Sequence, residues 1–328
     1  MGPYDAAVII DGHNDLVLQR WRDTPTRHLD LDAARAAGFS GGFFALYVPS
    51  PGVAFPDELP YALPLPDPIP YKDAAAIAEE LYATLCALPV RRATSVDDFV
   101  EGELTAIVHL EGAEPIAPDL SNLEHWYERG LRSLGPVWSR ANVFAEGVPF
   151  AFPGGPDTGP GLSDAGRGLV RACNELGILV DCSHLNEAGF WDVVRLSDAP
   201  VVATHSNAHA LCPATRNLTD AQLEAIRDSG GVVGVNFAVS FLREDGANRP
   251  ADTGIAEIVR HVAYLVERMG VDHVALGSDF DGAVIPDELG GAPGLPKLVD
   301  ALRARFDDAA VDKITHGNWL RVLDETWR

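Results

Sequence analysis

Residues 177–207 constrain the fold most, because they place two histidines at the ends of two consecutive apolar runs. The runs are ILVDC and PVVAT; the first leads into Ser183-His184 and the second into His205-Ser206. One amphipathic segment of helical length separates them, which predicts a strand, a helix and a second, parallel strand. Parallel neighbours end at the same edge of a sheet, so His184 and His205 are expected to lie together there. Two imidazoles brought together in this way predict a metal site.

The same alternation of apolar runs and helical patterns continues along the whole chain. Six further runs have the character of buried strands, at residues 6–10, 41–48, 105–110, 131–137, 231–237 and 273–277. Helical patterns lie between or after them, at residues 72–88, 163–176, 220–229, 254–269, 295–305 and 307–327. Eight strands that alternate with helices predict an α/β fold, a (β/α)8 TIM-like barrel. The 328 residues, 47% of them hydrophobic, suffice for one large core, so residues 1–328 are expected to form a single domain.

Two segments rich in proline and glycine, near residues 49–72 and 143–161, interrupt this alternation. Each follows a strand and shows no periodicity. A plain linker is one interpretation of such a segment. Long loops within a compact domain are more typical of lids and binding loops, and we expect that role here.

Polar residues of the metal-ligand type follow five of the predicted strands. They are His13 and Asp15 after the first strand, Glu111 after the third, His184 after the fifth, His205 after the sixth and Asp279 after the eighth. The carboxyl ends of barrel strands are where this fold places its active sites. The sequence therefore predicts a metal site at that end of the barrel.

The net charge and the composition limit which classes of partner the protein can bind. The net charge of -23 argues against nucleic-acid binding, which needs an excess of lysine and arginine. We find no secretion signal at the N-terminus, no apolar run long enough for a membrane helix, and no CxxC spacing among the four cysteines. The expectation is a cytoplasmic protein with reduced cysteines and no membrane association.

Several short motifs, taken together and in order, resemble one family. They are His13-Asn14-Asp15, His109-Leu110-Glu111-Gly112, Asp181-Cys182-Ser183-His184, Thr204-His205-Ser206-Asn207, Arg216-Asn217 and Gly277-Ser278-Asp279-Phe280-Asp281-Gly282. The set looks like the membrane dipeptidase (renal dipeptidase) family of zinc peptidases, and the similarity extends to Gly317-Asn318-Trp319.

The resemblance implies a binuclear zinc dipeptidase with two Zn²⁺ per chain. One ion would be held by His13, Asp15 and Glu111, and the other by Glu111, His184 and His205. Glu111 would bridge the two ions, and a bridging hydroxide would attack the peptide bond. Imidazole and carboxylate are ligands that suit zinc, and a carboxylate can span two ions.

The resemblance also implies roles for two further residues. Asp279 would shuttle a proton from the attacking water to the leaving amine. Asp281 competes for this role on the sequence alone, and only the family pattern favours Asp279. Arg216 would bind the C-terminal carboxylate of the substrate, which a guanidinium fits in bidentate fashion.

The chain departs from the family pattern at the end of the fourth strand. Many members have a histidine there, whereas this chain has Val137-Trp138-Ser139. We expect Trp138 to form a wall of the substrate cavity beneath the loop at residues 143–161; the alternative is that it only caps the barrel core. Asn142, at the start of that loop, is a further expected substrate contact.

The expected substrate is a small dipeptide, with tolerance of a D-residue at its C-terminal position. The main alternative is an amidohydrolase that uses the same metals on N-acyl amino acids or other small amides. A metal-holding protein without turnover is a third interpretation, which Asp279 and Arg216 disfavour. A homodimer is the expected assembly if the protein associates.

Overall fold

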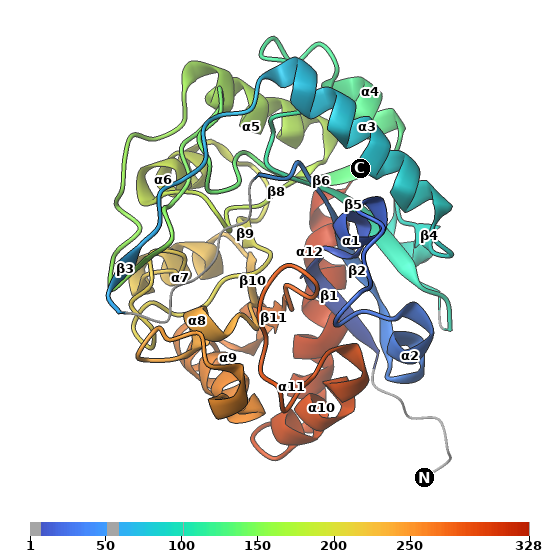
Figure 1. The fold of residues 1–328 in the computed structure, drawn as a ribbon, viewed down its shortest axis with the longest axis vertical. Coiled ribbons are helices and arrows are strands. Elements are labelled where there is room, and N and C mark those ends of the chain that lie inside the picture. Colours follow the sequence, from blue (N-terminus) through green and yellow to red (C-terminus); the bar gives the residue numbers. More distant parts are fainter. Residues whose placement is uncertain (1–7, 51–58, 101, 328) are drawn as a thin grey trace.

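Eight parallel strands form the centre of the protein (Figure 1). The computed structural model describes residues 8–50, 59–100 and 102–327. The strands are β1 (Ile9–Asn14), β2 (Phe39–Tyr47), β5 (Thr105–Glu111), β6 (Leu131–Gly135), β8 (Leu179–Val180), β9 (Val202–Ala203), β10 (Val232–Val235) and β11 (Val274–Leu276). Each corresponds to one of the eight runs expected from the sequence, with bounds that differ by a few residues.

The strands form two arcs that close into a barrel in chain order. One arc runs β1-β2-β5-β6-β8 and the other β9-β10-β11, with parallel pairing throughout. A single parallel bridge, Asp181 with Val202, joins the arcs at one seam. Another, Asn14 with Phe280, joins them at the other seam. The expected (β/α)8 barrel is therefore confirmed.

β1 differs from its expected position and brings the first metal-ligand candidate into the sheet. The expected strand at residues 6–10 lies partly outside the described residues, and β1 extends instead to Asn14. Asp11 and Asn14 pair with Gly42 and Phe44 of β2, so the backbone stays extended through His13. His13 is consequently fixed by the sheet rather than by a turn.

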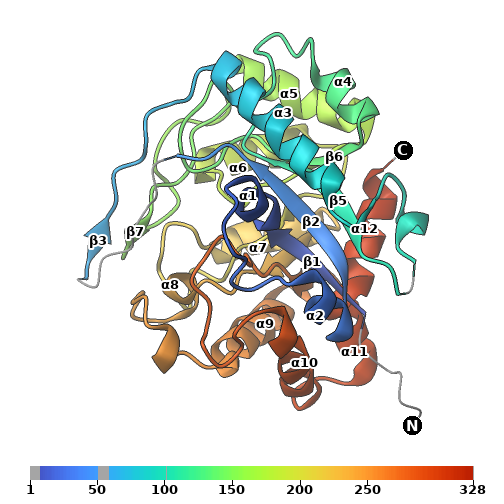
Figure 2. The ribbon, with the colours of Figure 1, turned by 45° about the vertical axis from the view of Figure 1, so that its right-hand side comes forward.

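The helices surround the barrel (Figures 1 and 2). They are α1 (Leu16–Trp21), α2 (Leu31–Ala36), α3 (Tyr71–Ala87), α4 (Leu123–Glu128), α5 (Asp164–Leu176), α6 (Glu187–Leu196), α7 (Asp220–Asp228), α8 (Val239–Leu242), α9 (Ile255–Met269), α10 (Leu295–Arg303), α11 (Asp308–Asp312) and α12 (Asn318–Thr326). Short 3-10 turns lie at Val96–Asp98, Pro250–Asp252, Val271–His273 and Ala292–Gly294. No helix in the described ranges has both the length and the apolar character needed to cross a membrane.

The last helical run contains a π-turn that directs two side chains into the barrel. The π-turn, Lys313–Gly317, separates α11 from α12 within the segment expected as one helix at residues 307–327. The turn precedes Asn318, whose Nδ2 donates to the carbonyls of Val271 (2.7 Å) and Val274 (2.8 Å). Trp319 is fully buried and its Nε1 donates to the Leu276 carbonyl at 3.0 Å. Its ring packs with inward-facing Ile10 and Phe43, so that the barrel interior is filled.

The two loops expected near residues 49–72 and 143–161 contact each other. Residues 51–58 lie outside the described residues. The remainder of the first loop contains β3 (Tyr61–Ala62), which pairs antiparallel with β7 (Ala151–Phe152) of the second. In Figure 2 β3 and β7 lie side by side, apart from the barrel. Around this pair, Tyr61, Phe150, Phe152 and Phe241 form a separate apolar cluster. A further two-residue strand, β4 (Arg91–Arg92), pairs with β5.

Candidate metal centre and active site

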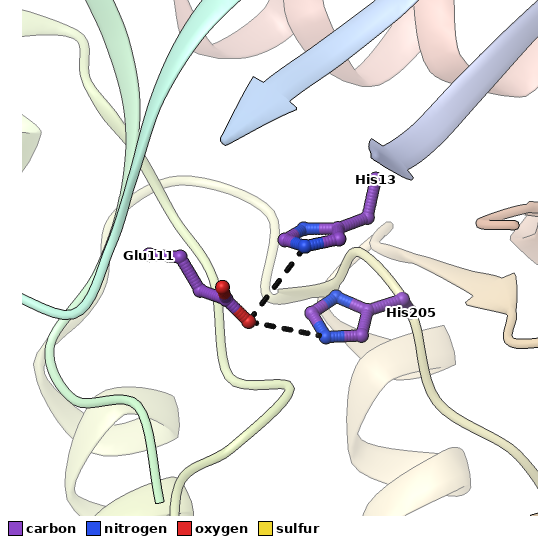
Figure 3. A group of neighbouring side chains, drawn as sticks. All are labelled: His13, Glu111 and His205. Atoms are coloured by element: carbon purple, nitrogen blue, oxygen red, sulfur yellow. Dashed lines mark ion pairs between the residues drawn. The ribbon is translucent and has the colours of Figure 1, made fainter. Parts of the chain in front are cut away.

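The residues expected at the strand ends converge on one carboxylate oxygen. Glu111 ends β5, and its Oε1 lies 3.1 Å from Nε2 of His184, 3.6 Å from Nε2 of His205 and 3.7 Å from Nε2 of His13. Figure 3 shows the Glu111 carboxylate facing the rings of His13 and His205. Zinc bonds of about 2.0–2.2 Å in tetrahedral geometry place ligand atoms roughly 3.3 Å apart. The observed spacings are therefore those of ligands arranged around a cation.

A second group extends the first toward β1 and β11. Nε2 of His13 lies 3.4 Å from Oδ2 of Asp15, and His13, Asp15 and Asp279 form a compact set with metal-ligand spacing. Both ring nitrogens of His13 are buried and have no hydrogen-bond partner within the described chain. Nε2 therefore has carboxylate oxygens nearby but no hydrogen bond to a described residue, and a cation bound between them would supply a direct partner for the buried nitrogen.

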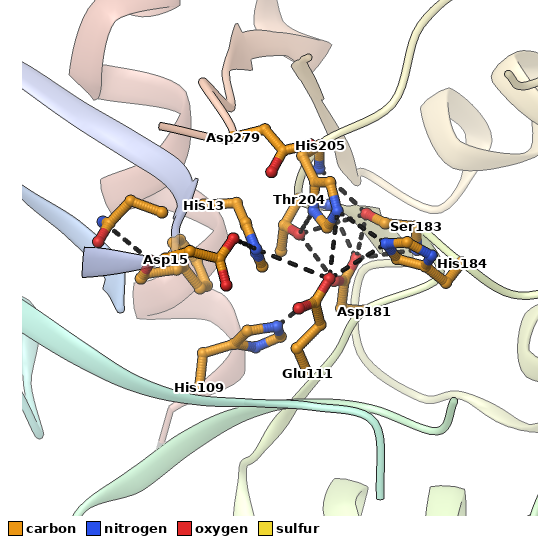
Figure 4. A network of polar contacts seen from close by, with 12 residues as sticks. His13, Asp15, His109, Glu111, Asp181, Ser183, His184, Thr204, His205 and Asp279 are labelled. Carbon is orange, nitrogen blue, oxygen red and sulfur yellow. Dashed lines mark hydrogen bonds and ion pairs between the residues drawn. The ribbon is translucent and has the colours of Figure 1, made fainter. Parts of the chain in front are cut away.

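Hydrogen bonds behind the site orient two of the imidazoles. Oγ of Ser139 lies 2.9 Å from Nδ1 of His184, and Oγ1 of Thr204 lies 2.8 Å from Nδ1 of His205. Asp181 fixes this layer, because it accepts hydrogen bonds from the Thr204 hydroxyl (2.7 Å) and the Ser183 hydroxyl (2.7 Å). Figure 4 shows the resulting network around Glu111. With Nδ1 engaged, the Nε2 atoms point into the site, as metal-ligating histidines require.

The electrostatics favour a divalent cation. Burial lowers the pKa of His184 and of His205 well below the usual value, helped by the charges of Arg216 and His13, so both rings are neutral. Burial also raises the pKa of Glu111 well above its usual value; His13 opposes this change, and the nearby Asp15 adds to it. The buried carboxylates raise one another's pKa, so a cation bound between them would stabilise their charged form. Neutral imidazoles and carboxylates of this kind are a donor set that a metal ion fits.

The two aspartates of the SDFDG segment have different surroundings in the structure. Asp279 lies in the cluster with His13 and Asp15, and its Oδ2 accepts a hydrogen bond from Asn236 Nδ2 at 3.0 Å. Oδ1 of Asp281 instead accepts from the backbone N–H groups of Arg27 (2.7 Å) and of the next residue (2.9 Å). Burial raises the pKa of Asp279, with His13 acting in the opposite direction. Asp279 therefore lies in the cluster of candidate metal ligands, whereas Asp281 holds the loop before α2.

The turn after β11 approaches the candidate metal ligands closely. Asp279 and Asp281 adopt φ values of 59° and 67°, a region that non-glycine residues rarely occupy. A Cβ atom at Gly282 would collide with Oδ2 of Asp15 and Oδ1 of Asp279. Positive φ at functional sites is held by surrounding structure, and here Asp279 N–H donates to the His13 carbonyl at 3.0 Å.

Arg216 lies against the histidines on the β8–β9 side. It is 3% exposed, and one of its Nη atoms donates to the Ser183 carbonyl. Nη2 lies 3.2 Å from Nε2 of His184, and the guanidinium lies 5.7 Å from the Phe241 ring centre. Burial lowers the pKa of Arg216 to about 10, with Asp279 and Glu111 opposing, so the group stays cationic at neutral pH.

A cavity of about 320 Å³ opens above these residues and is lined by Asp15, Glu111, His184, Arg216 and Asp279, among others. Trp138 also lines it, and its ring lies 5.7 Å from the His184 ring and 5.6 Å from the Phe150 ring. Phe150 belongs to the loop at residues 143–161, so the Trp138 ring packs against that loop.

Asn142 is not brought to the cavity. Its Oδ1 accepts hydrogen bonds from the backbone N–H groups of Phe144 (2.8 Å) and Ala145 (3.1 Å), and its Nδ2 donates to the Pro136 carbonyl at 2.9 Å. All of these partners lie in the same loop, so the side chain shapes a turn. This position does not support the expected substrate contact, because the amide groups are already used.

Three residues behind the site were not anticipated as contributors. Ser139, Asn236 and Asp181 each orient a ligand candidate or Asp279 through the contacts given above. Serine and asparagine near strand ends are common, so only the folded arrangement reveals these roles. Asp181 did carry a signal, since it belongs to the Asp181-Cys182-Ser183-His184 motif.

Comparison with known proteins identifies the family. A sequence model described as Membrane dipeptidase (Peptidase family M19) matches residues 4–327. A metallo peptidase from Rhodobacter sphaeroides, liganded with a phosphinate mimic of the dipeptide L-Ala-D-Ala, superposes with a TM-score of 0.95 at 47% identity. The match covers 98% of this chain and 100% of that one.

Two further relatives agree with this result. A structure described as the dipeptidase AC, a metallo peptidase of family M19, gives a TM-score of 0.93 at 47% identity over 98% of this chain and 99% of the other. Dipeptidase tcpJ from Claviceps purpurea (strain 20.1) is 28% identical over 334 residues, which cover 96% of this chain and 76% of the relative. The chain therefore belongs to the membrane dipeptidase family, peptidase family M19, and is a metallodipeptidase.

Proposed function

We propose that this metallodipeptidase binds two zinc ions, with Glu111 between them. His13 and Asp15 would complete one set of ligands, and His184 and His205 the other. The observation that carries the proposal is the convergence of three Nε2 atoms on one oxygen of Glu111, at 3.1 to 3.7 Å. Histidine nitrogen and carboxylate oxygen are ligands that zinc accepts, and a carboxylate can serve two ions.

When bound, the two cations supply Lewis acidity, which lowers the pKa of a water molecule and polarises the scissile carbonyl. The residues of the chain do the rest. Asp279 accepts the proton of the attacking water and returns it to the leaving nitrogen, with Asn236 holding its carboxylate in place. Burial raises the pKa of Asp279, which favours this use because a carboxylate that binds a proton more readily is a better proton acceptor.

Arg216 would bind the substrate's C-terminal carboxylate. It lines the cavity beside His184 and remains cationic in a site rich in carboxylates. Because Nη2 of Arg216 lies 3.2 Å from Nε2 of His184, a carboxylate bound by the guanidinium would lie close to the candidate metal ligands, which favours short substrates. Trp138 and Phe150 line the same side, so the C-terminal side chain would meet an aromatic surface.

A D-residue at the C-terminal position is part of this proposal. The Rhodobacter sphaeroides relative is liganded with a mimic of L-Ala-D-Ala and shares 47% of its residues with this chain. A cytoplasmic location is also proposed, in keeping with the four cysteines being free. We further propose a homodimer, which sedimentation of the purified protein would test.

The experiment is a substrate panel with the metal-loaded protein. L,L and L,D dipeptides, their C-terminal amides and N-acyl amino acids would be compared by kcat/KM. The proposal expects dipeptides with a free carboxylate to be hydrolysed best, because only they can engage Arg216. Equal turnover of the amides would remove the role of Arg216, and a preference for N-acyl amino acids would favour the amidohydrolase alternative.

A further inference from the structure

Two arginines stand at the mouth of the cavity, on the side of β1. Arg22 and Arg27 lie between α1 and α2, are exposed, and contribute to the lining of the cavity. Neither has a carboxylate within ion-pair distance among residues 8–50, 59–100 and 102–327. Other arginines do, such as Arg140, whose Nη2 lies 2.9 Å from Glu114. The two cations at the mouth are thus available to a ligand.

Contacts with the turn after β11 fix one of these arginines near the reacting centre. The Arg27 backbone N–H donates to Asp281 Oδ1 at 2.7 Å, and its Nη2 donates to the Asp281 carbonyl at 3.3 Å. Gly282, the residue after Asp281, lies so close to Asp15 and Asp279 that no Cβ would fit there. Arg27 therefore contacts the turn whose next residue abuts Asp15 and Asp279, and it lines the same cavity as they do, so one substrate can contact both.

Because the molecule as a whole is acidic, two arginines at the cavity without an ion pair in the described part of the chain indicate an anionic ligand. The chain carries 48 acidic and 25 basic residues, and the cavity itself contains Asp15, Glu111, Asp279 and Asp281. The bound zinc ions of the proposed function would offset Asp15, Glu111 and Asp279. An anionic substrate side chain that points away from these ions enters an acidic molecule, where Arg22 and Arg27 are cations that line the cavity on the β1 side. A guanidinium is well suited to bind a carboxylate, through two parallel hydrogen bonds.

The order of the strands around the barrel places Arg22 and Arg27 at the opposite side of the cavity from Arg216. Arg216 and the aromatic residues Trp138 and Phe150 belong to segments after β6 and β9, whereas Arg22 and Arg27 follow β1, across the barrel. If Arg216 binds the C-terminal carboxylate, as in the proposed function on which this step rests, the N-terminal residue points toward β1. We propose that Arg22 and Arg27 select dipeptides with an acidic N-terminal residue and an apolar C-terminal residue.

Matched substrates test this specificity directly. The zinc-loaded protein would be assayed with Glu-Leu and Gln-Leu, each with L- and D-leucine, at low and high salt. The two substrates have nearly the same shape and differ in charge. We expect the Glu/Gln ratio of kcat/KM to exceed about fivefold at low salt and to fall as salt screens the charges. Arg22→Gln and Arg27→Gln should each reduce the ratio about two- to fivefold, and the double variant should bring it near one.

The control is Arg20→Gln, because Arg20 is exposed on α1 and does not line the cavity. It should leave the Glu/Gln ratio unchanged, and the Tm of every variant would show that it folds. Hydrolysis of Gln-Leu without an arginine-dependent preference for Glu-Leu would overturn this inference and leave the proposed function intact. An arginine-dependent preference for Leu-Glu over Leu-Gln instead would overturn the assigned orientation. Failure of the zinc-loaded protein to hydrolyse any dipeptide would overturn the proposed function and this inference together.

Discussion

Oγ of Ser139 lies 2.9 Å from Nδ1 of His184 and so holds the ring with Nε2 toward Glu111. We predict that Ser139→Ala weakens metal binding by about 10- to 100-fold, because an unanchored imidazole loses its orientation. Competition with a chelator would measure the change. Ser133→Ala is the matched control, since it removes the same kind of contact (2.9 Å) from His109, which is not a proposed ligand. Equal loss of metal from both variants would contradict the prediction.

Asp279→Asn should lower kcat by about 10²–10⁴-fold while the metal content stays constant, because an amide cannot shuttle a proton. Asp281→Asn is the comparison within the same turn. Its amide oxygen can still accept from the Arg27 backbone N–H, so kcat should change by less than about tenfold. Steady-state kinetics and elemental analysis would be carried out on both variants. A larger loss in Asp281→Asn would reassign the proton shuttle.

Glu111→Gln should reduce the zinc content from two ions per chain to fewer than one after dialysis, since one side chain serves both proposed ions. Glu114→Gln provides the control three residues along the chain. Glu114 pairs with the buried Arg140 outside the ligand cluster. Glu114→Gln removes the negative charge that pairs with the Arg140 guanidinium. The free energy of unfolding should therefore fall by about 3–5 kcal/mol while zinc is retained. Full zinc content in Glu111→Gln would exclude the bridging role.

Trp138→Ala and Trp138→His should change the ranking of dipeptides by kcat/KM, because Trp138 lines the cavity beside His184. The alanine variant should gain most on substrates with large C-terminal side chains, which would fill the space vacated by the indole. Folding and zinc content would be checked in parallel. An unchanged ranking together with a lower Tm would show that Trp138 only supports the core.

His261 makes stability depend on pH. It is buried on α9, with Nε2 2.9 Å from the Leu242 carbonyl and Nδ1 accepting from Ala208 N–H at 3.2 Å. Burial lowers its pKa from 6.5 to about 3. Between these pH values the unfolded chain binds a proton that the folded chain does not, so the free energy of unfolding falls as pH drops below 6.5.

The expected loss from His261 is at most about 1.4 kcal/mol per pH unit, or about 2 kcal/mol at pH 5. His261→Gln keeps a donor and an acceptor but does not titrate, so its stability should fall less between pH 7 and pH 5. Urea unfolding at both pH values would measure this, with exposed His125→Gln as the control. Identical pH dependence in His261→Gln and the unmodified protein would contradict the prediction.

Local sequence signals predicted much of the fold. Ser163 caps α5 and accepts from the Gly166 N–H at 3.0 Å, and Thr219 forms a capping box with Gln222 at the start of α7. Such caps depend on residues within one helical turn, so they are visible in the sequence. The ligand candidates were predictable as well, because each follows an apolar run and the barrel brings all strand ends together.

Features made by distant residues could not be predicted. The pairing of Tyr61 with Phe152 joins two loops that share no local pattern. Asn142 has the character of a substrate contact by its position after Trp138, yet its amide completes a turn. Asn236 orients Asp279 from another strand, across 43 residues. In each case the partner is selected by the closed barrel rather than by neighbours along the chain.

The two bridges that close the barrel have a consequence for the maturation of the protein. Asn14–Phe280 is flanked by His13, Asp15 and Asp279, and Asp181–Val202 is flanked by His184 and His205. His205 and Asp279 follow strands of the second arc, so they meet the candidate ligands of the first arc only after both arcs have joined. A nascent chain, or one that has opened at a seam, holds only separate fragments of the site. Activity would then depend on closure of both seams, and peptide hydrolysis measured during mild denaturation would test whether activity is lost before the chain unfolds.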